Sequence, residues 1–285
     1  MKTWSLTRVA TFLAMSALLL STVGCVEEKD TLTVYPSGAG KIHLYQKLGV
    51  QLSGMVTGFA EKGKEQQALD SSLYKDLSKW QGISAWAPVK AMLADGQVVY
   101  EATGYFDDVT ALKKTDGDNV DTFLWAAVPA GGFSFTWKSG NGAPQQPFAD
   151  TTTEQDQMLT AMMEGMKGLR IEHAVVMPGA VDKCSGCTEH KDRTAAHVIT
   201  DDDVIKLFAL QKDYRARIAN NQITKEKATA EFTEKTKSLM EDLVVSTASS
   251  GANTEFEQFQ KEYRKAKTDA AASGIADKIQ QAAAH

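Results

Sequence analysis

The chain has 285 residues and a formal net charge of −5, because its 36 acidic residues outnumber its 31 basic ones. This mild acidity excludes a protein that binds nucleic acid or that holds anionic lipid through a basic patch. The hydrophobic share of 43 % and the charged share of 24 % are ordinary for a globular protein with one large domain or one domain and an appendage.

The start of the chain has the layout of a secretory signal. Lys2 and Arg8 form a positive beginning, a mostly apolar run extends from Val9 to Leu20, and small residues precede Cys25. This pattern is typical of a cleaved signal peptide, and the run is short for a permanent membrane span, which needs about 20 residues. The sequence therefore predicts a signal peptide over residues 1–24, whose removal changes the net charge from −5 to −7.

The end of this segment, Thr22-Val23-Gly24-Cys25, resembles the lipobox of bacterial lipoproteins, with Thr22 where that family usually has leucine. The resemblance implies cleavage before Cys25 and acyl chains on its thiol, while an ordinary cleaved signal and an uncleaved anchor are the alternatives. Two chains suffice for stable attachment, since each buried CH₂ contributes about 0.8 kcal/mol. Val26 after the cysteine implies, by the sorting rules of Gram-negative bacteria, an outer-membrane protein that faces the periplasm.

A short tether and a hairpin are expected next. Residues 25–30 are charged, and the five residues after Cys25 reach only about 17 Å when extended, so the folded part is expected close to the membrane. Residues 31–45 alternate apolar and polar side chains around a turn at 36–40, which predicts a β-hairpin. The turn lacks the full spacing of a phosphate-binding loop, and a strand rather than a helix follows it.

One helix and two further hairpins follow in the sequence. Leucines at positions 69, 73 and 77 predict an amphipathic helix over residues 64–80. Apolar residues occupy the odd positions from 83 to 93, and an Asp-Gly turn at 95–96 leads into a return strand. A third hairpin is predicted over residues 123–137. Clean alternation of this kind indicates an antiparallel sheet with one face covered.

The later elements are mixed. A loop over residues 139–153 precedes a helix over 154–167, whose methionines are interpreted as core. Residues 169–177 and 195–200 are expected to form a strand and its returning partner. Thr200 to Asp203 then caps a helix that ends near residue 220, with its carboxylates favourably placed at the positive end of the helix dipole.

The last part of the chain is expected to be helical. After residue 223 no strand signal is evident, and large apolar residues such as Phe256 and Phe259 are too few for a separate core. The predicted fold is α+β, with antiparallel hairpins forming a sheet packed against helices and a helical C-terminal extension. The expected divisions are the signal peptide 1–24, the lipidated tether 25–30, an envelope domain 31–221, and a helical hairpin 222–285 that packs on that domain or binds a protein partner.

Two segments of residues 31–200 carry a further resemblance. Gly104-Tyr105-Phe106-Asp107-Asp108 ends a long predicted hairpin, and Val176-Met177-Pro178-Gly179-Ala180-Val181 ends a late predicted strand. With the order of elements, they make this range similar to the LppM-type bacterial lipoproteins. The resemblance implies a two-layer α/β domain at the cell envelope with no established catalysis. The loop that contains Cys184 and Cys187, and the helical tail, depart from that family.

The cysteine pair is the main candidate for chemistry. If Cys25 is acylated, Cys184 and Cys187 remain as a pair in an oxidising compartment, where a structural disulfide is the default. A redox couple would need a lowered thiolate pKa, which a polar loop does not provide. A zinc site formed by both cysteines with His190 and His197 is the remaining alternative, although zinc requires thiolates.

Other catalytic patterns are not found. The sequence lacks Gly-x-Ser-x-Gly and His-Glu-x-x-His motifs. Asp107 and Asp108 are neighbours on a strand and therefore point to opposite faces. His173 is interpreted as a satisfied, partly buried residue and His43 as a surface residue.

The resulting hypothesis is a non-catalytic binding or structural component of the cell envelope, without a cofactor and with an unknown ligand. It is held to the membrane through Cys25. The alternative is a thiol-disulfide or metal-dependent activity at Cys184 and Cys187.

Overall fold

The computed structural model describes residues 26–284, apart from 59, 118, 130, 141–147, 149–166, 240 and 250–254. The predicted signal peptide, Cys25 and nearly all of the helix predicted over 154–167 lie outside the described residues. None of the described helices combines the length and the apolar character needed to cross a bilayer.

Two sheets form the framework of the molecule. The strands of the larger sheet are β1 (Glu27–Val34), β2 (Gly40–Leu48), β4 (Ala85–Trp86), β5 (Lys90–Ala94), β6 (Gln97–Phe106), β10 (Arg170–Val176), β12 (Glu189–Lys191) and β13 (Thr194–Thr200). Their order is β12-β13-β10-β1-β2-β6-β4, and β5 also pairs with β6. The hairpin predicted over 31–45 is confirmed as β1 and β2. The strand predicted over 83–93 is divided around Pro88, which has no N–H to donate to β6.

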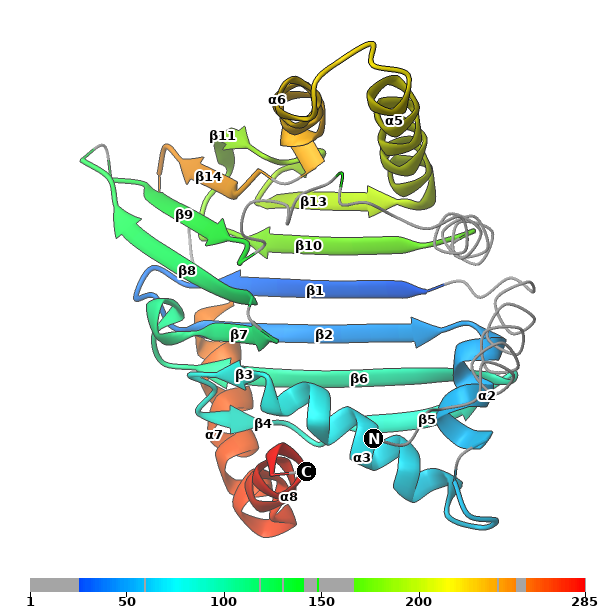
Figure 1. Ribbon diagram of the computed structural model, residues 1–285. Coiled ribbons are helices and arrows are strands. Elements are labelled where there is room, and N and C mark those ends of the chain that lie inside the picture. The colour runs from blue at the N-terminus through cyan, green and yellow to red at the C-terminus, as the bar shows by residue number, and fades with distance from the viewer. Residues whose placement is uncertain are drawn as a thin grey trace.

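The smaller sheet lies in front of the larger one in Figure 1. Its strands are β3 (Trp80–Gln81), β7 (Lys113–Asp116), β8 (Asn119–Ala127), β9 (Phe133–Lys138), β11 (Val181–Ser185) and β14 (Leu243–Thr247), in the order β11-β14-β9-β8-β7-β3. The hairpin predicted over 123–137 is confirmed as β8 and β9. It belongs to a second sheet, whereas the sequence pattern led us to expect one.

The helices that the structure describes pack mainly against the larger sheet. They are α2 (Val50–Gly58), α3 (Glu65–Ser78), α5 (Asp201–Ala219), α6 (Lys225–Thr236), α7 (Phe256–Ser273) and α8 (Ile275–Ala283), with short 3₁₀ turns η1 (Val109–Ala111) and η2 (Lys237–Leu239). The predicted helix over 64–80 is confirmed as α3, with its three leucines buried. Thr200 and Asp203 form a reciprocal capping box at the start of α5, as the sequence suggested. The predicted α+β fold is therefore confirmed.

The main core fills the space between the larger sheet and the elements in front of it. The alternation of β1 and β2 puts Leu32 and Ile42, which are partners in the register, on one face of the larger sheet. Phe135 of β9 and Leu77 of α3 pack against that face from the front. Each such side chain contributes about 1.5–3 kcal/mol when fully buried, so one continuous core holds both sheets and α3 together.

The predicted tether is wrong in its extent. Residues 27–30 belong to β1, where Glu27 is paired with Lys47 on one side and with Arg170 on the other. Only Val26 remains between Cys25 and the strand. The pairing of β1 with β10 is parallel, which the hairpin patterns did not predict, because parallel partners are joined by long connections and leave no local turn signal.

The predicted helical hairpin over 222–285 is also wrong in part. This range contains β14, which lies between β11 and β9 in the smaller sheet. The two helices after β14 pack in different places. Helix α7 packs on the outer face of the larger sheet through Phe259, whereas α8 places Ile275 in the main core. The range therefore completes the sheet domain and is not an appended unit.

We expect the burial of β14 to be measurable with two neighbouring valines. Val245 is fully buried and Val244 is 38 % exposed. Val245→Ala should lower the free energy of unfolding by about 2–3 kcal/mol, because it leaves a cavity in the core, and Val244→Ala by no more than about 0.5 kcal/mol. Urea denaturation of both variants provides the comparison, and equal effects would contradict the placement of β14.

Candidate functional site

A charged cluster lies between the two sheets at the inner face of β1. The register places Asp30 of β1 beside His173 of β10. Glu28, two residues earlier in β1, lies on the same face because side chains alternate along a strand. Lys114 of β7 comes from the smaller sheet, where it is paired with Trp80 and Asp121. The cluster therefore joins side chains from three strands that are far apart in the sequence.

Lys114 forms an ionic bridge between the sheets. Its Nζ atom lies 2.9 Å from Oδ2 of Asp30 and 3.2 Å from Oε1 of Glu28. Asp30 is only 3 % exposed, so its carboxylate depends on this partner. Burial acts to lower the pKa of Lys114, but the charges and hydrogen bonds of the two carboxylates outweigh it and hold that pKa above its ordinary value. Lys114 is thus a fixed cation.

His173 stands next to this bridge without a hydrogen bond at Nδ1. That atom is buried and lies 3.7 Å from Oδ2 of Asp30. The ring packs at 4.8 Å from the ring of Trp137, whose Nε1 donates to Asp121. Burial lowers the pKa of His173. The sequence correctly predicted a partly buried histidine, but the prediction that its polar atoms are satisfied is wrong for Nδ1.

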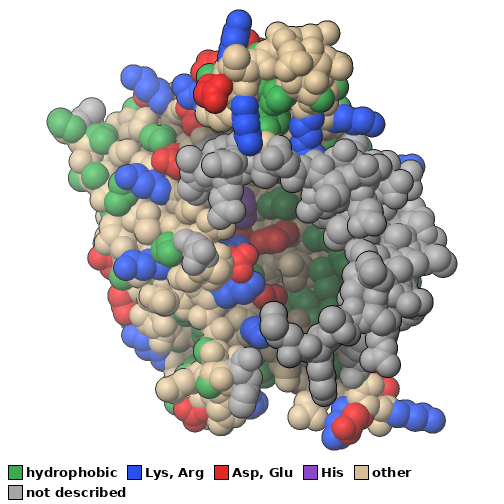
Figure 2. Space-filling view, viewed as in Figure 1, with side chains coloured by type: hydrophobic (Ala, Val, Ile, Leu, Met, Phe, Trp, Pro, Cys, Tyr) green, Lys and Arg blue, Asp and Glu red, His purple; other side chains and the backbone are tan. Residues whose placement is uncertain are grey.

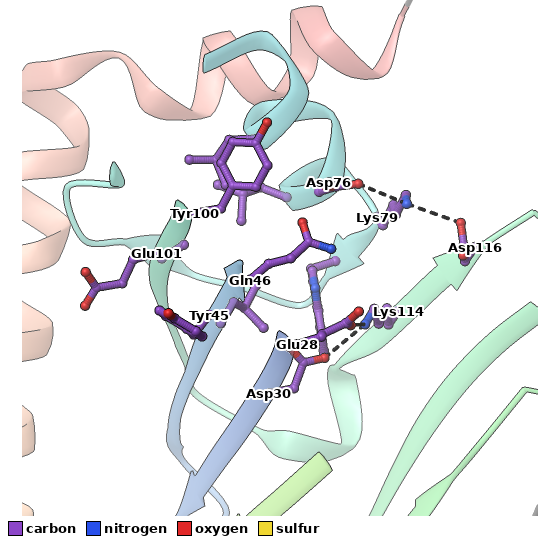
Figure 3. Close-up of a pocket in the computed structure, with 15 residues that line it drawn as sticks. Glu28, Asp30, Tyr45, Gln46, Asp76, Lys79, Tyr100, Glu101, Lys114 and Asp116 are labelled. Atoms are coloured by element: carbon purple, nitrogen blue, oxygen red, sulfur yellow. Dashed lines mark hydrogen bonds and ion pairs between the residues drawn. The ribbon is translucent and has the colours of Figure 1, made fainter. Parts of the chain in front are cut away.

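A cavity of about 260 Å³ opens beside the Lys114 bridge. It lies between α3, the edge of the smaller sheet and the inner face of the larger sheet, and Figure 2 shows this face of the molecule hollowed, with charged and hydrophobic side chains visible inside. Figure 3 shows Gln46 between the charged groups, while Tyr45 and Glu101 point to the opposite side of the sheet. The hydrophobic part of the lining comes from Leu44, Leu73, Leu77, Trp80 and Ala102.

A second lysine bridge borders the same cavity. Nζ of Lys79 lies 3.0 Å from Asp76 and 3.3 Å from Asp116. Burial acts to lower the pKa of Lys79, and the two carboxylates outweigh it, so the pKa is raised. Together the two bridges supply four carboxylates and two ammonium groups, which leaves an excess of negative charge around the cavity (Figure 3).

The predicted cysteine pair lies elsewhere, at the junction of β11 and β12. The sulfur atoms of Cys184 and Cys187 lie at disulfide distance, with Cα atoms 6.1 Å apart. Cys184 is part of β11 opposite Val245, so it is set in a sheet and not at a helix N-terminus, where thiolates are stabilised. Gly186 between them has a φ of +68°, and a Cβ there would lie 2.2 Å from the carbonyl oxygen of Asp242.

His197 and His190, the two histidines of the alternative zinc site, differ in burial and in their contacts. His197 is buried, and its Nδ1 lies 2.7 Å from the carbonyl oxygen of Gly186, so it holds the cysteine loop in place. His190 is exposed on β12. Among the residues that the structure describes, no group of three or more His, Cys, Asp or Glu side chains is placed to hold a metal ion.

The acidic residues after β6 have structural partners. Asp107 accepts hydrogen bonds from the hydroxyl groups of Tyr263 (2.8 Å) and Ser84 (2.9 Å), and the Tyr263 bond is the main reason that the pKa of Asp107 is lowered. Asp108 instead caps η1 by accepting from the backbone of Thr110. His43 lies 3.2 Å from the hydroxyl of Thr103 on the outer face of the larger sheet.

Comparison of the chain with protein-family models, with curated proteins and with solved structures found no match. The lipobox and the LppM-type resemblance remain predictions from the sequence alone.

Lys114, Asp30 and the cavity were not predicted from the sequence. One signal was present: the alternation that puts Leu32 and Val34 on the inner face continues backwards through Asp30 and Glu28. Two carboxylates on an otherwise apolar face require a cation, but its position in the sequence follows only from the packing of the second sheet.

We expect the Lys114 bridge to be important for stability. Lys114→Met should lower the free energy of unfolding by about 3 kcal/mol, because it leaves Asp30 as an unpaired charge between the sheets. Lys113→Met, one residue earlier and exposed, is the matched control. Denaturant unfolding at pH 7 measures both, and a loss of less than about 1 kcal/mol for Lys114→Met would show that the bridge is dispensable.

His173 should also make stability depend on pH. In the unfolded chain a histidine takes up a proton near pH 6.5, whereas in the folded chain the lowered pKa delays this. Below that pH the unfolded state binds more protons, so the free energy of unfolding should fall as the pH decreases from about 7 to 5. His173→Phe should flatten this profile and His190→Gln should not; parallel profiles for the wild type and His173→Phe would refute the assignment.

Proposed function

We propose that the protein is a lipid-anchored binding component of the bacterial cell envelope. Its ligand would occupy the cavity between α3 and the two sheets. The ligand class is a small molecule that carries a protonated amine and an apolar part. The observation that supports this most directly is the ring of four carboxylates and two lysines around a partly hydrophobic cavity.

The charge balance favours a cation. Glu28, Asp76 and Asp116 retain exposed surface, with side chains that are 26 %, 43 % and 71 % exposed. Each lysine neutralises only one of its two carboxylate neighbours. A ligand ammonium group would supply the missing positive charge and up to three hydrogen bonds.

The hydrophobic part of the lining favours an apolar group. Leu73 and Leu77 of α3 and Trp80 of β3 border the cavity, and Leu44 and Ala102 continue this wall on the larger sheet. Binding pockets generally combine such surfaces with a few polar groups that fix orientation. The polar and apolar sides together would orient an amphipathic amine.

The state of the lysines supports binding and not catalysis. Lys114 and Lys79 each have a raised pKa and two carboxylate partners. A lysine acts as a nucleophile only when it loses its proton, which requires a lowered pKa. These two residues are therefore suited to holding charge in place.

Location at the envelope is part of the same proposal. Its support is the lipobox at Cys25, with the outer membrane facing the periplasm as the expected position. The short distance in sequence between Cys25 and β1 is compatible with a domain held at a membrane surface.

Calorimetric titration of the full chain in detergent with phenethylamine and with the uncharged 2-phenylethanol tests the proposed ligand class. We expect the amine to bind at least about tenfold more tightly, a difference of about 1.4 kcal/mol. Asp76→Asn should remove most of this preference, since it deletes one carboxylate of the ring.

Glu172→Gln is the control for that titration. Glu172 is ion-paired with Lys29 on the outer face of the larger sheet, away from the cavity. Equal affinity for amine and alcohol would contradict the charge argument, and an equal effect of Asp76→Asn and Glu172→Gln would place binding outside the cavity.

A further inference from the structure

One end of the larger sheet carries an unusual helix. The nine residues of α2 include no charged side chain. Its residues Val50, Leu52 and Met55 are 55 %, 37 % and 43 % exposed. An exposed helix normally has charged or polar residues on its outer face, so α2 has the composition of a helix whose outer face is covered.

The edge strand β5 adds to this surface. Leu93 is 54 % exposed, next to the turn that joins β5 to β6, and its partner Val98 puts it on the inner face of the larger sheet. A Cβ on Gly96 in that turn would lie 3.8 Å from the side chain of Val50, so the turn and α2 are in contact. We call the four residues Val50, Leu52, Met55 and Leu93 the apolar end patch.

The first strand begins at the same end of the sheet. β1 starts where β2 ends, with Glu27 beside Lys47, and β2 leads through Leu48 and a single residue into α2. Figure 1 shows the start of β1, the end of β2 and α2 together at the right of the sheet. The order β1-β2-β6-β5 and a strand spacing of about 4.8 Å put β5 about 14 Å from β1.

We propose that the apolar end patch inserts into the lipid interface of the membrane to which the chain is anchored. This inference rests on the proposed lipid on Cys25. Only Val26 separates that cysteine from β1, and one residue spans at most about 3.6 Å. The bilayer surface is then within reach of the patch.

The interaction is driven by apolar burial and not by charge. The segment after α2 contains Glu61 and Lys62 as well as Lys64 and Glu65, so positive and negative charges are balanced there. Acyl chains on Cys25 and the patch would act as two contacts that fix the orientation of the domain. Binding of the patch should therefore be similar on neutral and on anionic lipid.

A fluorescent label sensitive to polarity tests this orientation in the full chain. Leu93→Cys and the control Leu124→Cys are each labelled with NBD and reconstituted in vesicles of phosphatidylethanolamine, with and without phosphatidylglycerol. Leu124 is 47 % exposed but lies on the outer face of the smaller sheet. We expect a blue-shifted emission at position 93, quenched several-fold more by a lipid-bound nitroxide than the emission at position 124.

Two measurements separate this inference from the proposed anchor. Flotation of the vesicles and the mass of the N-terminal peptide report whether the chain is attached and acylated at Cys25, and failure of both refutes the anchor itself. If the acylated chain floats but the label at 93 is as exposed to water as that at 124, the patch does not enter the membrane. A blue shift at 93 without nitroxide quenching indicates a protein occupant and equally overturns the inference.

Discussion

The ionic bridge from Lys114 to Asp30 and Glu28 links the two sheets through partly buried charges. It places a cation from β7, the neighbour of the edge strand β3 in the smaller sheet, against two carboxylates at the beginning of β1, the strand that pairs with both β2 and β10. On one side of the bridge the sheets are packed through aromatic and aliphatic side chains. On the other side the cavity begins. The bridge therefore marks the place where the core ends and the solvated part of the interface starts.

The core is built from strands that are far apart in the sequence. β1 needs β10 as a parallel partner, and β9 needs β14, which comes more than a hundred residues later. Both pairings must close long loops before they contribute stability, so such a fold depends on cooperative assembly. The final residues take part in this as well, because Ile275 of α8 lies in the main core. The C-terminal range thus connects the layers instead of forming a separate unit.

The cavity and the apolar end patch lie near the same part of β1. Glu28 borders the cavity and is two residues from Val26, a distance of about 7 Å along a strand. In the proposed orientation the cavity lies close to the lipid interface, and an amphipathic amine is a type of molecule that accumulates there. Under these two proposals, helix α2 would position the domain, and the four carboxylates around the cavity would select the charge of the ligand.

The sequence by itself determined the helices and hairpins whose patterns lie within a short stretch of the chain. Alternation with a turn defined the β1–β2 and β8–β9 hairpins, leucine spacing defined α3, and Thr200 with Asp203 defined the start of α5. The close approach of Cys184 and Cys187 was also accessible from their spacing and from the expected compartment.

Tertiary structure alone decided the pairing of strands that are distant in the sequence, such as β1 with β10 and β9 with β14, because no local pattern links those segments. Five residues of the tail that was predicted to be helical form β14. The spacing of Leu243 and Val245 is compatible with a helix or a strand, and pairing with β9 and β11 decides for the strand. Glu28 and Asp30, which the sequence assigned to a tether, instead line the site. A carboxylate on an apolar face is stable only where a cation reaches it, and here that cation is the distant Lys114.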